Sequence, residues 1–296
     1  MPAVEDAGWH VSYLWSKSSG LRLGVCDYRG DRVLQSAAVP FVYVTYQGNR
    51  AGPFTDELRS TSADVELREI LHGFDLKVRY DLYGPDYEYE QVWRFHDDGQ
   101  FGSTVLVHGP GEEIRGQHSY HVPFRFDLDV SGKGGDCFQR RGAGEWVDVP
   151  REGQHLPVAP PNWDWRVLDR STGKAALVRA RAADAGELWA LRYKRLESWS
   201  SWGGALEAVP GSAGSVPAIY DNGQSVQGAN LVLWYIAHLG SVDGIAACGP
   251  WFGLEGYPQP EDDDKHPDHP QDDEHPGNDD DHDHPPGGGH HQAKPS

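Results

Sequence analysis

The sequence predicts an all-β fold, a large antiparallel β supersandwich, followed by a disordered C-terminal tail. Apolar and polar residues alternate along much of the first 258 residues, and over residues 74–82 they do so without a miss, which is the period of a half-buried strand. Turn signals such as Asp97-Asp98-Gly99 separate these runs. From residue 259 onward, Leu, Ile, Val, Phe, Trp, Tyr and Met are all missing. The fold is therefore assigned to residues 1–258.

The same alternation gives the expected strands in order. They are residues 21–28, 33–46, 74–82, 87–95, 101–108, 124–130 and 188–196. Residues 231–237 are continuously apolar, which predicts a central strand covered on both faces. Residues 171–186 fit a helix or an Ala-rich strand equally well.

Residues 259–296 form the predicted tail. They hold twelve carboxylates, two lysines and seven of the fifteen histidines. A segment without apolar side chains cannot offset the entropy of ordering, so we expect it to be disordered. Its imidazoles and carboxylates would bind transition metals weakly; the alternative is a solubilising acidic tail with incidental histidines.

Composition excludes several classes of function. A net charge of −19 argues against nucleic-acid binding through a basic surface. No apolar run reaches the length of a membrane span. Three widely separated cysteines indicate free buried thiols. With no signal-like N-terminus, we expect a cytoplasmic protein.

Three stretches resemble the catalytic domain of the copper amine oxidases, the topaquinone-containing primary-amine oxidases. Residues 86–95 read Asp-Tyr-Glu-Tyr-Glu-Gln-Val-Trp-Arg-Phe, and residues 118–132 contain His-Ser-Tyr-His followed by Phe-Arg-Phe-Asp-Leu-Asp-Val. Residues 230–235 read Asn-Leu-Val-Leu-Trp-Tyr. The resemblance covers residues 9–257 and implies a short, divergent member without the family's N-terminal domains.

The resemblance implies a copper-dependent oxidoreductase that converts a small primary amine to an aldehyde with O₂, releasing ammonia and hydrogen peroxide. Tyr87 occupies the position of the topaquinone precursor, with Asp86 where the family has Asn. Asp56 is the candidate base that removes the substrate proton. The alternatives are a packing role for Tyr87 and a surface turn at Asp56. The resemblance also allows a homodimer.

The resemblance places copper near His118, His121 and His238. The family's second ligand position falls on Tyr120, and its third on Ser241. On an unbroken strand His118 and Tyr120 share one face and His121 takes the other, unless a bulge at Pro123 turns His121 round. Three alternatives stay open at this position: His121 replaces the missing ligand, Tyr120 replaces it, or the site is lost to hydrogen-bonded histidines.

The family's calcium-type site corresponds to Asp127, the Leu128 carbonyl, Asp129 and Asn230. Oxygen donors of this kind suit a hard cation, although exposed carboxylates beside Arg125 need no ion. Two further functions compete with the oxidase. One is a metal-binding pseudoenzyme or scaffold that retains the fold without quinone catalysis. The other is a carbohydrate-active supersandwich protein, consistent with eleven tryptophans but resting on fold analogy.

Overall fold

A computed structural model describes most of the body of the chain. The described residues are 1–16, 20–46, 54–58, 64–81, 88–108, 118–132, 134–158, 162–194, 217–240, 242 and 244–260. The chain divides into two units after Pro260, and the predicted tail lies outside the described residues except for its first two, Gln259 and Pro260. No helix in the described ranges has the length and apolar character needed to cross a membrane.

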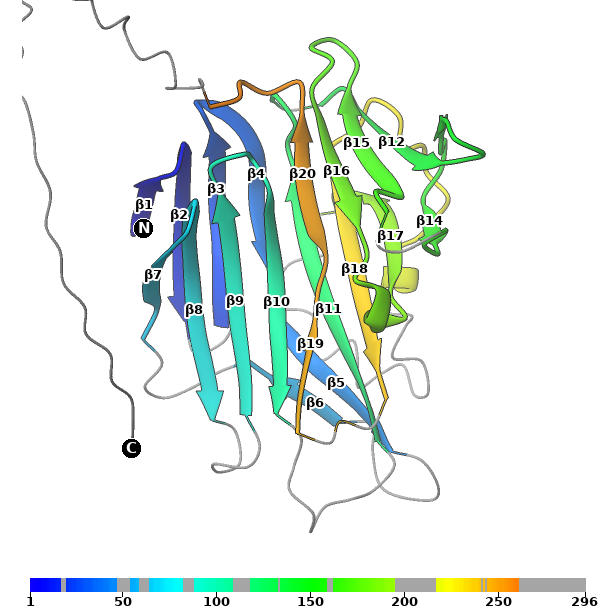
Figure 1. The fold of residues 1–296 in the computed structure, drawn as a ribbon. Coiled ribbons are helices and arrows are strands. Elements are labelled where there is room, and N and C mark those ends of the chain that lie inside the picture. The colour runs from blue at the N-terminus through cyan, green and yellow to red at the C-terminus, as the bar shows by residue number, and fades with distance from the viewer. Residues whose placement is uncertain are drawn as a thin grey trace, which may run out of the picture. The chain divides into compact units, whose positions relative to one another are not determined.

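Two ten-stranded antiparallel sheets form the body, which confirms the predicted all-β sandwich (Figure 1). Sheet A has the order β1-β2-β3-β4-β11-β18-β17-β14, with β5 paired to β11 and β6 paired to β5. Its strands are β1 (Ala3–Asp6), β2 (Trp9–Ser16), β3 (Gly20–Tyr28), β4 (Asp31–Ala38), β5 (Phe41–Tyr46), β6 (Phe54–Glu57), β11 (His118–Leu128), β14 (Gly153–His155), β17 (Glu187–Arg192) and β18 (Leu231–Leu239).

Sheet B has the order β13-β12-β15-β16-β20-β10-β9-β8-β7, with β19 paired to β10. Its strands are β7 (Glu66–Ile70), β8 (Gly73–Asp81), β9 (Glu88–His96), β10 (Phe101–His108), β12 (Asp136–Arg141), β13 (Trp146–Asp148), β15 (Trp165–Asp169), β16 (Ala175–Arg179), β19 (Ile245–Cys248) and β20 (Trp251–Glu255). Within the described ranges, two short 3-10 turns accompany the strands, η2 (Ala182–Asp184) and η5 (Pro217–Ile219).

Most of the buried apolar residues form one core cluster, which takes side chains from strands of both sheets. Strand β18 contributes to two clusters, as its continuous apolar sequence predicts. Leu231, Leu233 and Tyr235 join the main core, whereas Val232 and Trp234 belong to a second cluster with residues of β5 and β17. Because alternate residues of a strand face opposite sides, β18 is covered on both faces. The three cysteines are free and buried, as expected.

One expected strand needs correction. Residues 33–46 are not one strand, because β4 ends at Ala38 and β5 begins at Phe41. Pro40 lies in the break, and proline cannot donate to a ladder. Both strands nevertheless pair with β11, β4 near Leu128 and β5 near His118. Of the two alternatives for residues 171–186, helix or Ala-rich strand, the structure has the strand, β16, followed by the η2 turn.

Candidate metal and redox site

Strands β11 and β18 run side by side in continuous register from Tyr120 to Leu128. No bulge occurs at Pro123, so His121 keeps the orientation that simple alternation gives it. Tyr120 is fully buried in the main core, and His121 lies on the opposite, outer face of sheet A. His238 is the cross-strand partner of His121 and continues the outward row of Trp234 on β18.

His121 and His238 meet at close range on this outer face. Their Nδ1 atoms are 2.6 Å apart, and the rings are edge-on at 72°. At this separation one Nδ1 carries a proton and donates it to the other. The other nitrogen of each ring has its own partner: Thr45 Oγ1 lies 3.2 Å from His121 Nε2, and Glu187 Oε2 lies 3.8 Å from His238 Nε2. Both Nδ1 atoms are therefore aimed at one point.

Glu187 is held in place by its own hydrogen bonds. Trp189 Nε1 donates to Oε1 at 2.9 Å, and Gln154 Nε2 donates to Oε2. Burial raises the pKa of Glu187, but the nearby His238 imidazole and hydrogen bonds from Trp189 and Gln154 outweigh burial and lower the pKa below its ordinary value. Glu187 therefore stays ionised beside His238 at neutral pH.

His121 is held neutral. Burial, and then the charge of His238, lower the pKa of His121 to about 4, against the opposing charge of Glu187. A neutral imidazole is the form that binds metals. This face of sheet A thus presents a neutral imidazole, a second imidazole and a fixed carboxylate.

The candidate base Asp56 lies on β6 in the buried part of the fold. Its side chain is 5% exposed, which overturns the surface-turn alternative. Tyr89 donates its hydroxyl proton to Asp56 Oδ2 at 2.7 Å, and the Tyr89 ring packs edge-on against Tyr120 with centroids 6.4 Å apart. The sequence prediction missed Tyr89, although it shares strand parity with position 87.

The structure brings only some of the predicted site residues together. Tyr87 and Ser241 lie outside the described residues. Position 118 lies at the start of β11, where it pairs with Tyr46. By strand alternation it belongs to the same face of β11 as Tyr120 and to the opposite face from His121. The side chain at position 118 is not described. Among the residues that the structure describes, no group of three or more His, Cys, Asp or Glu is placed to hold a metal ion.

The predicted calcium residues lie at the far end of β11 from the histidine pair. Asp127 and Asp129 are buried, and Asp127 lies 3.7 Å from the Arg125 guanidinium. Gln35 Nε2 donates to Asp129 Oδ2 at 2.5 Å. The backbone carbonyl of Asn230 accepts a hydrogen bond from the Tyr193 amide. These residues are therefore partly engaged with protein groups.

A further carboxylate in this region, Asp136 on β12, was missed by the sequence prediction. It is 1% exposed, and neither of its oxygens has a hydrogen-bond partner of ordinary geometry in the described part of the chain. Burial, then the charges of Asp129 and Asp169, raise the pKa of Asp136 to about 8, against a weaker opposing effect of the Val130 backbone N–H. Asp136 comes close to Asp169 through the pairing of β12 with β15, and sequence spacing does not predict which strands pair.

Comparison with known proteins identifies the fold. No protein-family model and no curated protein sequence matches this chain. Among solved structures, a copper-containing benzylamine oxidase from Hansenula polymorpha has a TM-score of 0.63 at 11% identity, over 86% of this chain and 59% of that chain. Aspergillus nidulans amine oxidase has a TM-score of 0.61 at 12% identity, over 84% of this chain and 50% of that one.

Pichia pastoris lysyl oxidase gives a similar result, with a TM-score of 0.60 at 12% identity over 86% of this chain and 52% of that one. The chain therefore has a copper amine oxidase-like fold, and it spans only 50–59% of the length of these three structures. At such identities the likeness concerns the fold and not the chemistry of the site.

Proposed function

We propose that the protein is a copper-binding relative of the copper amine oxidases whose metal ligands are His121 and His238. The observation that carries this proposal is the convergence of the two Nδ1 atoms, 2.6 Å apart, while Thr45 and Glu187 lie next to the two Nε2 atoms. Metal-binding histidines ordinarily have such a partner on the nitrogen that does not bind the metal.

The donor set fits copper. Imidazole nitrogen suits copper, nickel and zinc, and copper(II) binds most tightly in the ordinary order of divalent metals. Two protein nitrogens leave coordination positions for water, O₂ or a substrate amine. Copper held there would supply one-electron redox chemistry. Glu187 would keep the proton of His238 on Nε2, so that Nδ1 presents its lone pair, and the Thr45 hydroxyl would do the same for His121.

The narrower amine-oxidase function stays a prediction. It requires a topaquinone from Tyr87, copper at His118, His121 and His238, and Asp56 as the base. Burial of Asp56 and its contact with the Tyr89 hydroxyl support a polar site between the sheets. However, no three-imidazole set occurs among the described residues, and the pair His121–His238 opens on the outer face. Tyr87, the proposed source of the quinone, lies outside the described residues.

The calcium site and the remaining expectations are also proposals. We propose that a cation binds Asp127, the Leu128 carbonyl, Asp129 and Asn230, and the unpaired Asp136 carboxylate supports it because a buried anionic cluster is stabilised by a positive ion. We propose a cytoplasmic location, supported by three free thiols. A primary amine as substrate and a homodimer remain proposals drawn from the family resemblance.

Copper binding by matched variants tests the proposal. Copper(II) is titrated against a competing chelator into the full-length chain and into the His121→Ala, His238→Ala and double variants. All four proteins carry the same seven tail histidines. Copper bound by the tail is therefore the same in each, and differences between the proteins report on His121 and His238. We expect the double variant to lose one high-affinity ion. His155→Ala removes a partly buried histidine from β14 of the same sheet and should change nothing. Equal copper binding by all five proteins would contradict the proposal.

A further inference from the structure

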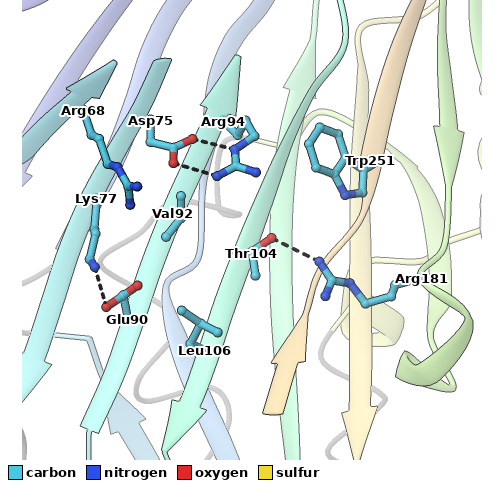
Figure 2. Close-up of a pocket in the computed structure, with 10 residues that line it drawn as sticks. All are labelled: Arg68, Asp75, Lys77, Glu90, Val92, Arg94, Thr104, Leu106, Arg181 and Trp251. Atoms are coloured by element: carbon cyan, nitrogen blue, oxygen red, sulfur yellow. Dashed lines mark hydrogen bonds and ion pairs between the residues drawn. The ribbon is translucent and has the colours of Figure 1, made fainter. Parts of the chain in front are cut away.

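A second feature lies on the outer face of sheet B, away from the core and from the histidine pair. Strands β7, β8, β9 and β10 and residues Arg181 and Trp251 enclose a hollow of about 250 Å³ (Figure 2). Figure 2 shows Arg68 at one end of this hollow, Arg181 and Trp251 at the other, and Arg94 between them. We call this feature the basic groove.

Strand alternation places these charges on the outer face. On β8, Phe74, Leu76 and Val78 enter the core, so Asp75 and Lys77 face outward. The register then aligns them with neighbouring strands: Asp75 lies between Arg68 on β7 and Arg94 on β9. Such rows normally form cross-strand ion pairs that stabilise a sheet.

The carboxylates of the basic groove are already used. Asp75 receives two hydrogen bonds from Arg94, at 2.7 and 2.8 Å, which is the two-pronged geometry of a strong guanidinium–carboxylate pair. Glu90 pairs with Lys77 at 2.8 Å. Both acidic residues of the groove are therefore neutralised by its two central cations.

Two arginines are left over. Arg68 is the cross-strand neighbour of Asp75, but both oxygens of that carboxylate bind Arg94. Arg181 donates a 3.4 Å hydrogen bond to the Thr104 hydroxyl. In the described part of the chain, no carboxylate forms an ion pair with either guanidinium. The residues that line the groove therefore carry two more positive than negative charges, in a protein of net charge −19. Outside the lining, the charge of Arg181 also acts on the buried Asp184 and lowers the pKa of that carboxyl.

A sheet needs no such excess for its stability, because isolated exposed guanidiniums gain little from burial or pairing. Planar guanidiniums bind oxyanions through paired N–H groups, and a hollow bordered by protein strengthens this attraction relative to open solvent. The overall negative field would repel anions elsewhere on the surface. The excess charge and the hollow thus coincide at one place.

We propose that the basic groove binds a small polyanion, a molecule that bears at least two carboxylate, phosphate or sulfate groups. Arg68 and Arg181 hold the anionic groups at the two ends, and the Thr104 hydroxyl donates to the part between them. The Arg94–Asp75 and Lys77–Glu90 ion pairs form the floor between these ends and carry no net charge. This site is separate from the proposed copper site and does not depend on it.

Calorimetric titration of the full-length chain with three probes tests the proposal: inorganic pyrophosphate, citrate and a disulfated disaccharide, with the unsulfated disaccharide as neutral control. We expect at least one anion to bind, the neutral sugar not to bind, and the affinity to fall as salt is raised. Which anion binds best identifies the group that the groove prefers. No binding by any of the three anions would overturn the proposal.

Variants locate the binding. Arg68→Gln and Arg181→Gln should each lower the affinity for the best-binding probe by about tenfold, the usual cost of one charge-assisted hydrogen bond. The double variant should lower this affinity further. Arg192→Gln removes the same charge from an exposed position on β17 of the other sheet and should leave the affinity within about twofold of wild type. Melting midpoints of all variants check that they fold. Equal losses in Arg68→Gln and Arg192→Gln, or no loss in either groove variant, would contradict the assignment.

Discussion

His121 and His238 face each other across the β11–β18 pair with their Nδ1 atoms 2.6 Å apart. Their position on the outer face follows from an unbroken register through Pro123, since one residue of shift exchanges the two faces of a strand. By the resemblance, the family's ligand positions fall on Tyr120 and Ser241. His121 lies one residue after the first of these and His238 three residues before the second. The proposed metal site depends on these two differences.

Glu187 should act on copper affinity through His238. Glu187→Gln keeps the size of the side chain but removes the charge that favours the Nε2 proton of His238. We expect copper affinity to fall about 10- to 100-fold, as for other groups that orient a metal ligand, while the number of bound ions at saturation stays the same. Chelator competition measures this effect. Glu255→Gln, an exposed carboxylate on β20 that pairs with Arg166, is the control; an equal fall in both variants would show a nonspecific charge effect.

The quinone hypothesis has its own test. If Tyr87 becomes topaquinone, copper and O₂ together should produce a visible absorbance band that phenylhydrazine shifts. Tyr87→Phe should abolish the band, whereas Tyr89→Phe removes the partner of Asp56 and should leave the band in place. Peptide masses report the modified tyrosine. An unmodified Tyr87 in copper-loaded, aerated protein would reject the amine-oxidase function and leave the metal-binding proposal standing.

Asp184 should make folding stability depend on pH. Its Oδ2 accepts hydrogen bonds from Tyr235 at 2.9 Å and from the Gly249 amide at 2.8 Å. Burial outweighs both and raises its pKa to about 6 from 3.8. The folded state therefore favours the protonated form, so its contribution is present below pH ~4 and is lost as pH rises through 6.

Urea unfolding between pH 4 and 7 measures this contribution. Relative to Asp184→Asn, the wild type should lose on the order of 3 kcal/mol of unfolding free energy over that range. Asp98→Asn, on a turn, serves as the control and should follow the wild type. A wild-type curve parallel to that of Asp184→Asn would show that folding does not raise the pKa of Asp184.

Calcium should stabilise the protein through the Asp136 region. A cation that binds only the folded state, at a hundredfold excess over its Kd, adds about 2.7 kcal/mol. Asp136→Asn should raise the melting midpoint without calcium, because it removes a carboxyl whose ionised form is disfavoured first by burial and then by the charges of Asp129 and Asp169. It should also reduce the calcium response. Asp148→Asn, a carboxylate on β13 paired with Arg170, is the control. A calcium response of equal size in Asp136→Asn and wild type would place the ion elsewhere.

The sequence predicted the local structure better than the long-range contacts. Alternation predicts strands such as β8 and β10, and the apolar run of β18 predicts its double coverage, because these patterns are local. Residues on both sides of Pro40 have strand-like patterns, so the sequence predicts one continuous strand. The break at Pro40 becomes visible only in the structure. Asp56 was assigned to a site or to a turn, and its burial beside Tyr89, 33 residues away, depends on sheet pairing that a sequence pattern does not specify.

The site was predictable in part. Strand alternation already separates His121 from Tyr120, and the register then follows from an unbroken ladder. Pairing of His121 with His238, 117 residues apart, depends on which strands are neighbours. Asp136 gave no signal, since its repulsion with Asp129 and Asp169 arises only after β12 is placed. The excess positive charge of the basic groove likewise cannot be seen in the sequence, because it depends on which residues of β7, β8 and β9 lie opposite one another.

Nitrogen NMR of the histidine rings tests the central claim most directly. A full-length chain with its seven tail histidines changed to glutamine is labelled with ¹⁵N-histidine, and copper(I), which is diamagnetic, is added. We predict that Nδ1 of His121 and of His238 shift together at one equivalent, that both Nε2 atoms are protonated in the copper-bound form, and that the signals of His155 do not move. Unshifted Nδ1 resonances of either His121 or His238, with copper bound, would contradict a site built on this pair.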